Sequence, residues 1–279
     1  MIFTLLSIEL YKIFKKWRTY IGFLAFGVFI PILIYGVSQG GNHYQRILER
    51  NLGDQFLIVG NLLNGWYVAF ITIQAMIIHI PFFISLVAGD LFAGEGTAGT
   101  YRMFLTRPIS RELVVITKYL AGFIYTLVFL IFFALLSTLP SIYFLGTGDL
   151  IVPLEKIVVI PSSEIIWRFL IAYFSSFISM CVVVSLAALF SSLVNNSIGP
   201  IVGTMAVIVI FLIIGELPFE LFEKISPYLF TKYMTVWLEA FDYPIDWSEI
   251  IKSLSILLAH ILLFFSITLL SFRKKDILT

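Results

Sequence analysis

Charged residues and glycines are concentrated in one stretch of this sequence, residues 90–118, which lies between two long apolar runs. Within it, Gly94, Gly96 and Gly99 have the spacing GxGxxG, which in dinucleotide-binding proteins cradles phosphates. Here the pattern follows a predicted membrane helix instead of a buried strand, and no GxxxxGK(S/T) loop occurs anywhere in the chain. The glycines are therefore interpreted as a flexible hinge. The chain itself is not expected to bind ATP.

Residue types that perform catalysis or bind metals are scarce. The histidines, His43, His79 and His260, lack metal-ligand spacing and have no cysteine or carboxylate cluster beside them. His79 and His260 fall in predicted spans, where neutral imidazoles are expected to hydrogen-bond between helices. HExxH and GxSxG motifs and paired intramembrane aspartates are absent. We therefore predict a chain with no catalytic site, cofactor or metal of its own. Because the span interiors hold no Asp or Glu, a proton-coupled antiporter is disfavoured.

The composition places these residues in a membrane protein. Hydrophobic residues make up 60% of the 279 positions, charged residues 13%, and the mean hydropathy is +1.01. A helical crossing needs about 20 apolar residues. The sequence predicts an all-α integral membrane protein in which residues 1–279 form one transmembrane domain. Its six expected spans are about 19–38, 66–89, 119–145, 169–194, 198–217 and 253–272.

Charge predicts the orientation of these spans, because short cytoplasmic loops keep an excess of Lys and Arg. With six spans, the face that holds both termini and the 90–118 loop collects eleven basic residues against five acidic ones. The other face has seven basic residues and twelve acidic ones. Both termini are therefore expected in the cytoplasm. The basic residues of the first face are Lys12, Lys15, Lys16, Arg18, Arg102, Arg107, Arg111, Lys118, Arg273, Lys274 and Lys275.

Two segments outside the spans, residues 1–18 and 216–252, also have patterns that predict local structure. In residues 1–18, apolar side chains such as Leu6, Leu10 and Ile13 recur at helical spacing, while Glu9 and the lysines occupy the remaining surface. This favours an amphipathic helix lying along the inner leaflet, although an ordinary basic flank that only sets topology fits as well. Residues 216–252 contain three prolines among short apolar patches, which favours short helices in an extracellular loop.

Local signals divide the 90–118 loop. Residues 100–105 can form a short amphipathic helix, which Arg107-Pro108 would stop. Ser110 can then cap a new helix that leads through Lys118 into the third span. A short helix across the mouth of two spans can act as a mechanical lever. The alternative is a plain basic loop that only fixes topology.

At these residues the sequence resembles the permease subunits of type-2 ABC exporters. The resemblance rests on Glu95, Gly99-Thr100, the run Leu105 to Arg111 and Lys118. The six-span layout, the basic amphipathic start, the tight turn between spans four and five and the long connection before span six also resemble that family. No fused ATPase domain and no large extracellular domain is matched.

The resemblance implies a subunit of the cell inner membrane that pairs with a second permease copy, as a homodimer or a related heterodimer. Two separate ATP-binding cassette subunits, carrying ATP and magnesium, would dock on its cytoplasmic face. The loop would carry the coupling helix, and the turn at Asn195 and Asn196 would make a second cytoplasmic contact. The residues expected at the ATPase-coupling interface are Glu95, Thr100, Arg102, Arg107, Pro108, Ser110, Arg111 and Lys118.

Two functions follow as alternatives. The first is a permease that moves a substrate outward with ATP hydrolysed by its partner. The second is a membrane anchor that recruits a cytoplasmic ATPase for envelope remodelling without transport. In either case the partners are the lipid bilayer and other proteins, not nucleic acid. A GxxxG pair, Gly199 and Gly203, is a possible dimer contact at the start of the fifth span.

Overall fold

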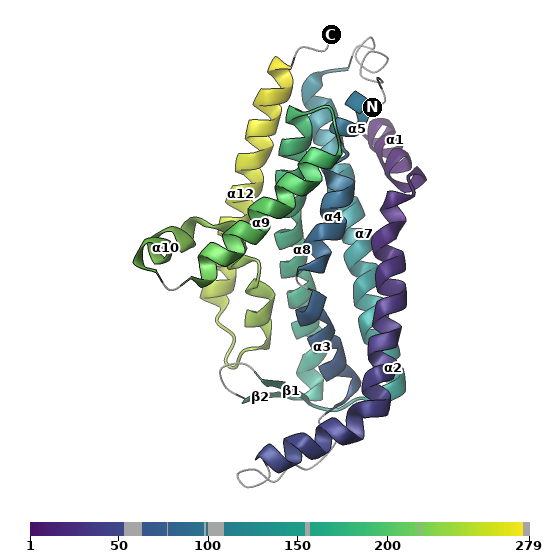
Figure 1. The fold of residues 1–279 in the computed structure, drawn as a ribbon, viewed down its shortest axis with the longest axis vertical. Coiled ribbons are helices and arrows are strands. Elements are labelled where there is room, and N and C mark those ends of the chain that lie inside the picture. The colour runs from purple at the N-terminus through teal and green to yellow at the C-terminus, as the bar shows by residue number, and fades with distance from the viewer. Residues whose placement is uncertain are drawn as a thin grey trace.

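The computed structural model of the chain describes residues 1–52, 63–76, 78–97, 99, 109–153, 157–217 and 219–275. Within these ranges, five helices are long and apolar enough to cross a membrane, and a bent helix pair makes a sixth span when counted as one. This confirms the predicted all-helical membrane fold. Figure 1 shows a tall bundle with both chain termini at one end, which we call the N/C end.

The elements follow the predicted order. The six spans are α2, the pair α3 and α4, α7, α8, α9 and α12. The bounds are α1 Ile2–Lys15, α2 Arg18–Leu52, α3 Gly65–Met76, α4 His79–Ala88, α5 Ala93–Thr97, α7 Arg111–Leu145, β1 Leu150–Pro153, β2 Ile157–Ile160, α8 Ser162–Leu193, α9 Ile198–Glu216, α10 Glu220–Ile225, η1 Ser226–Tyr228, α11 Phe230–Tyr233, η2 Val236–Phe241 and α12 Trp247–Lys274.

Helix α8 forms the centre of the bundle and packs against α4, α7, α9, α12 and η2. Small side chains dominate its buried surface, which allows close approach where lipid provides no hydrophobic drive between helices. Two of its serines satisfy their hydroxyls within the helix: Ser179 donates to the carbonyl of Ser175, and Ser185 to that of Cys181. Ser191 instead bonds the loop after α4, and the buried Ser175 hydroxyl has no hydrogen-bond partner among the described residues.

The second span is broken. Helix α3 ends at Met76, α4 begins at His79, and their axes differ by 57°. Pro81 lies in the first turn of α4 and lacks the amide that would continue the α3 hydrogen-bond ladder. A kink at Pro81 is expected from the sequence. Pro31, for which a kink is also expected, lies within the single helix α2.

The opposite end of the bundle contains a short β-hairpin that was not predicted from the sequence. Strands β1 and β2 form an antiparallel hairpin in which Leu150 pairs with Ile160 and Val152 with Val158. Side-chain burial alternates along both strands, so one apolar face rests on the bundle. β-Branched residues suit such a half-buried pleated surface. The short helices predicted between spans five and six are present as α10, η1, α11 and η2.

Candidate functional site

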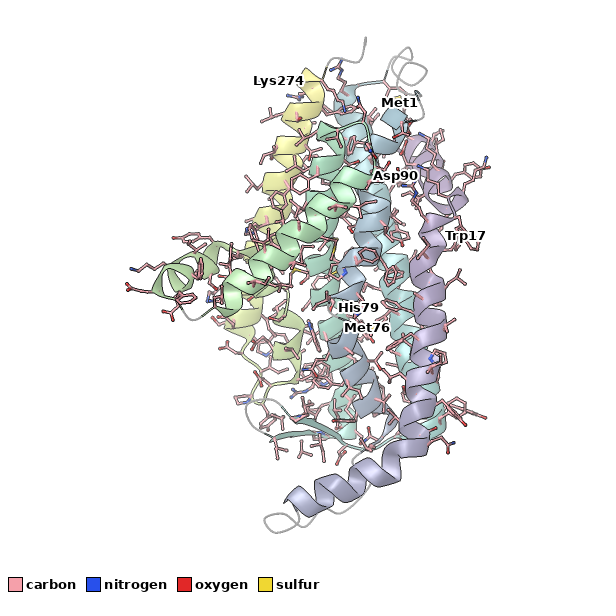
Figure 2. The ribbon with its side chains drawn as sticks, viewed as in Figure 1. Met1, Trp17, Met76, His79, Asp90 and Lys274 are labelled. Carbon is pink, nitrogen blue, oxygen red and sulfur yellow. The ribbon has the colours of Figure 1, made fainter. Side chains whose placement is uncertain are left out.

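A group of ionisable side chains occupies the N/C end, where α1 crosses the ends of α4 and α7. We call it the charged network. Figure 2 shows Asp90 beside α1, between the labelled Met1 and Trp17. The network lines a pocket of about 220 Å³. Its members are Glu9, Lys12, Lys16, Arg18, Asp90, Glu95 and Lys118.

Lys118 is the most deeply buried member, with 2% of its surface exposed. It lies two turns into α7. Its ammonium Nζ is 2.8 Å from Oε2 of Glu9 and donates to the Leu91 carbonyl at 2.7 Å. Oε1 of Glu95 lies 3.4 Å away. A buried ammonium is tolerated only when paired and hydrogen-bonded, so these contacts tie α1, α7 and the loop after α4 together.

Lys12 joins the same two carboxylates from the side of α1. Its Nζ lies 2.8 Å from Oε1 of Glu9 and 2.5 Å from Oε1 of Glu95. Burial alone would lower the pKa of Lys12, but Glu9 and Glu95 raise it more strongly, so the pKa lies above its ordinary value. Lys12 therefore stays charged at neutral pH. Glu9, expected on the solvated surface of this helix, is instead 3% exposed because it pairs with Lys12 and Lys118.

Asp90 anchors the corner between α1 and α2. Its carboxylate contacts Lys16 Nζ at 2.5 Å and Arg18 Nη1 at 3.0 Å, and it accepts a hydrogen bond from the Ser197 hydroxyl. Only 5% of Asp90 is exposed. Because Ser197 precedes α9, this one side chain connects the first, second and fifth spans.

The turn between α8 and α9 is also fastened to the loop. Ser191 Oγ accepts the amide hydrogens of Phe92 and Ala93, at 3.0 and 2.9 Å, and donates to the Gly89 carbonyl at 2.7 Å. Thr97 Oγ1 donates to the Asn195 carbonyl at 2.8 Å. These bonds satisfy backbone groups at the start of the short helix α5, where they have no intrahelical partners. The hairpin turn and the loop thus form one unit.

Two cations bind the ends of neighbouring helices. Arg111 Nη1 donates to the carbonyls of Arg273 and Lys275, at 2.7 and 2.9 Å, at the C-terminal end of α12. Lys275 Nζ donates to the Ser192 carbonyl at 3.0 Å, at the end of α8. Cations are favourable at helix C-termini, where carbonyls point outward without partners. Burial lowers the pKa of Lys275 below its ordinary value.

The residues predicted at the ATPase-coupling interface lie in several different places in the structure. Glu95 and Lys118 belong to the charged network, and Arg111 contacts the end of α12. Ser110 accepts the Leu113 amide at 3.3 Å, which confirms the predicted helix cap. Asn195 and Asn196 are exposed in the hairpin turn. The predicted helix at 100–105 and four site residues lie outside the described residues: Thr100, Arg102, Arg107 and Pro108.

Most of the charged network is not predictable from the sequence. Lys12, Lys16 and Arg18 were expected only to orient the spans, and no partner was expected for Asp90. One signal was available, because Glu9 is an acid within an otherwise basic helix and stands three residues before Lys12. In the structure the network sets four cations against three carboxylates. Each carboxylate is engaged by cations, so the arrangement suits bracing better than general acid–base chemistry.

Other predicted features are placed differently. His260 Nδ1 lies 2.8 Å from the Ile256 carbonyl of its own helix, so its hydrogen bond is not the expected interhelical one. A Cβ at Gly203 would lie 3.5 Å from Phe190 of α8, whereas Gly199 faces open space. Of this GxxxG pair, Gly203 therefore packs against another helix of the same chain, whereas Gly199 does not. Within the described residues, no cluster of His, Cys, Asp or Glu could hold a metal ion.

The loop glycines allow close approach. A Cβ at Gly94 would lie 2.6 Å from Oδ1 of Asp90, and a Cβ at Gly96 would lie 3.0 Å from Oδ1 of Asn195. Both distances are below ordinary van der Waals contact. The lack of a side chain is therefore required at these two glycines by close packing; the expected hinge stays a prediction. Gly99 differs, since its φ of +65° is a conformation that favours glycine.

We expect Gly94→Ala to destabilise the protein by about 1–3 kcal/mol, the usual cost of overpacking. The added methyl group would push the Asp90 carboxylate away from Lys16 and Arg18. The matched control is Gly27→Ala in α2, where a Cβ meets nothing within 4 Å and alanine favours the helix. Thermal unfolding in detergent measures both variants. Equal melting temperatures for the two would contradict the close-contact explanation.

Comparison with known proteins adds one match. A family described as "Protein of unknown function (DUF2705)" matches residues 20–278, which include all six spans. No family of ABC permeases is among the matches. No curated protein matches the sequence.

Proposed function

This chain belongs to the DUF2705 family and is a multi-span membrane protein, and we propose that it is the permease subunit of an ATP-driven exporter. A separate ATP-binding cassette subunit would hydrolyse ATP with magnesium. Two such subunits would serve two permease copies. The chain would supply the membrane pathway and the mechanical coupling.

The observation that supports this proposal is how the loop after the second span is attached. It contacts α1 and α7 through the charged network and the α8–α9 turn through Ser191 and Thr97. Hydrogen bonds to charged groups contribute about 1.5–3 kcal/mol each, so a shift of the loop would either break several of these contacts or move its neighbours with it. A force applied there would reach several spans together. Coupling of ATP hydrolysis to transport needs such a connection.

The proposal assigns the N/C end to the cytoplasm, on the basis of its excess of Lys and Arg. It also divides the roles of the charged residues. Glu95 and Lys118 would brace the loop from within, because both are largely buried. Arg102 and Arg107 would supply the contacts to the ATPase. The exposed Asn195 and Asn196 would add a second contact beside them.

The test is reconstitution with a candidate ABC ATPase, sought first as a GxxxxGK(S/T) protein in the neighbouring reading frame. We expect the purified chain alone to show no ATPase activity and the two proteins to form a complex. Arg107→Ala should weaken that complex at least about 30-fold, because truncating one partner of a desolvated charge pair costs about 2–5 kcal/mol. Hydrolysis stimulated by cargo in proteoliposomes would distinguish an exporter from a membrane anchor.

The matched control is Lys224→Ala, which also removes one positive charge. Lys224 lies in α10, which projects from the side of the bundle away from the N/C end (Figure 1); it is 71% exposed and pairs with the exposed Glu220. We expect its complex to be as stable as the parent's. A chain that binds no ATPase, or that loses binding through Lys224 but not Arg107, would refute the proposed coupling surface.

A further inference from the structure

The break between α3 and α4 lies deep in the membrane. Eleven residues separate His79 from Asp90 at the N/C end, which is about 16 Å of helix at 1.5 Å per residue. The hydrocarbon core is about 30 Å thick, so His79 lies near its middle. Figure 2 shows Met76 and His79 at mid-height of the bundle. Ile78 offers no side-chain cap to α4, and helix ends leave backbone groups without intrahelical partners.

Polar side chains lie on the outer surface at this break. Gln74 and His79 are both exposed, in one stripe with Ala75, Ile78 and Phe82. Neither Gln74 nor His79 has a hydrogen-bond partner among the described residues. Hydrocarbon can neither donate nor accept hydrogen bonds, so an amide, an imidazole and interrupted backbone are all unfavourable against lipid. Such groups normally face protein or a water-filled cavity.

Apolar helices flank the polar stripe on both sides. Helices α2 and α9 each pack against α4, and Figure 1 shows them diverging on either side of α3 and α4. Both helices expose large apolar side chains. Those exposed on α2 include Leu24, Val28 and Ile32, and those on α9 include Val202, Val209 and Ile213. A polar centre with apolar flanks is the arrangement expected of a protein contact inside a membrane.

We infer that a second copy of this chain covers this face, so that Gln74 and His79 of the two copies hydrogen-bond across a two-fold axis. An amide and a neutral imidazole each carry both a donor and an acceptor, which lets one surface pair with its own copy. The contact would also shelter the backbone at the break from lipid. The site is incomplete in one chain, because the unsatisfied groups of each copy would supply the partners of the other.

This inference extends the permease proposal to its dimer partner, but its first test needs no ATPase. In a Cys181→Ser background, we expect Ala75→Cys to form disulfide-linked dimers when membranes are oxidised. The matched control is Ile131→Cys, on the exposed side of α7 at comparable depth, which should remain monomeric. Absence of cross-links at both Ala75→Cys and Ile78→Cys, in protein that inserts normally, would overturn the inference.

A second variant tests the hydrogen bonds. In the Ala75→Cys background, Gln74→Leu with His79→Leu should weaken self-association about 3- to 20-fold, the range for interhelical hydrogen bonds in membranes. Were the face exposed to lipid, leucine would be at least as favourable as the parent residues. Unchanged cross-linking would therefore refute the polar contact. Cross-linking without any ATPase complex would contradict the permease proposal alone, whereas an ATPase complex without cross-linking would contradict only the dimer face.

Discussion

Lys118→Ala should destabilise the protein by about 3–5 kcal/mol, the largest effect we expect at the N/C end. The substitution removes an ammonium that is 2% exposed and leaves Glu9 buried with Lys12 as its remaining cation. Breaking a buried ion pair by removing one partner costs this much, because the other charge loses its compensation. The Leu91 carbonyl also loses its donor. Thermal unfolding in detergent and the amount of inserted protein would report the loss.

The double variant Glu9→Leu with Lys118→Met removes both charges of the buried pair but keeps the side-chain volume, so it distinguishes the effect of an unpaired charge from that of lost packing. Replacing a buried pair with apolar side chains of similar volume is often nearly neutral, so we expect the double variant to be more stable than Lys118→Ala. The surface control is Lys252→Ala, whose ion pair with Glu249 is exposed to solvent and is expected to contribute little to stability. A double variant no more stable than the single one would show that Lys118 matters for its contact with the Leu91 carbonyl instead.

Arg168→Ala should cause a comparable loss at the opposite end of the bundle. Arg168 of α8 is 2% exposed, and its Nη1 donates to the carbonyls of Ala240 and Asp242 at 3.1 and 2.8 Å. Its Nη2 lies 2.9 Å from Oε2 of Glu164. Truncation would leave the buried Ala240 carbonyl and the half-buried Asp242 carbonyl without this donor, at about 1–3 kcal/mol for each. We therefore expect a loss of about 2–5 kcal/mol and release of the η2 segment from α8.

Proteolysis of the intact protein would detect that release, since cleavage between α9 and α12 should become faster than in the parent. Arg168→Lys is the informative companion variant. A lysine keeps the charge beside Glu164, but its single ammonium cannot reproduce the planar fork of donors, so partial rescue is expected. Full rescue by lysine would show that charge, and not the geometry of the donors, holds η2 in place.

The positions of the spans follow from the sequence because hydrophobicity is a local property. An apolar run of about 20 residues satisfies its backbone by forming a helix in lipid, whatever its neighbours are. The Ser110 cap and the short helices after α9 were predictable for the same reason, since caps and prolines act within one or two turns. The hairpin of β1 and β2 was not predicted, because strands of four residues provide too little alternation to recognise.

The pairing of charges was decided by the tertiary structure. Glu9 and Lys118 are 109 residues apart, and nothing in their order specifies that α1 lies across the ends of α4 and α7. The same is true of Arg111, which reads as a loop charge but contacts carbonyls at the C-terminal end of α12. Hydrophobic spacing decided which segments enter the membrane. Packing of the spans decided which ions become buried together, because an ion pair depends on distance in space and not on separation along the chain.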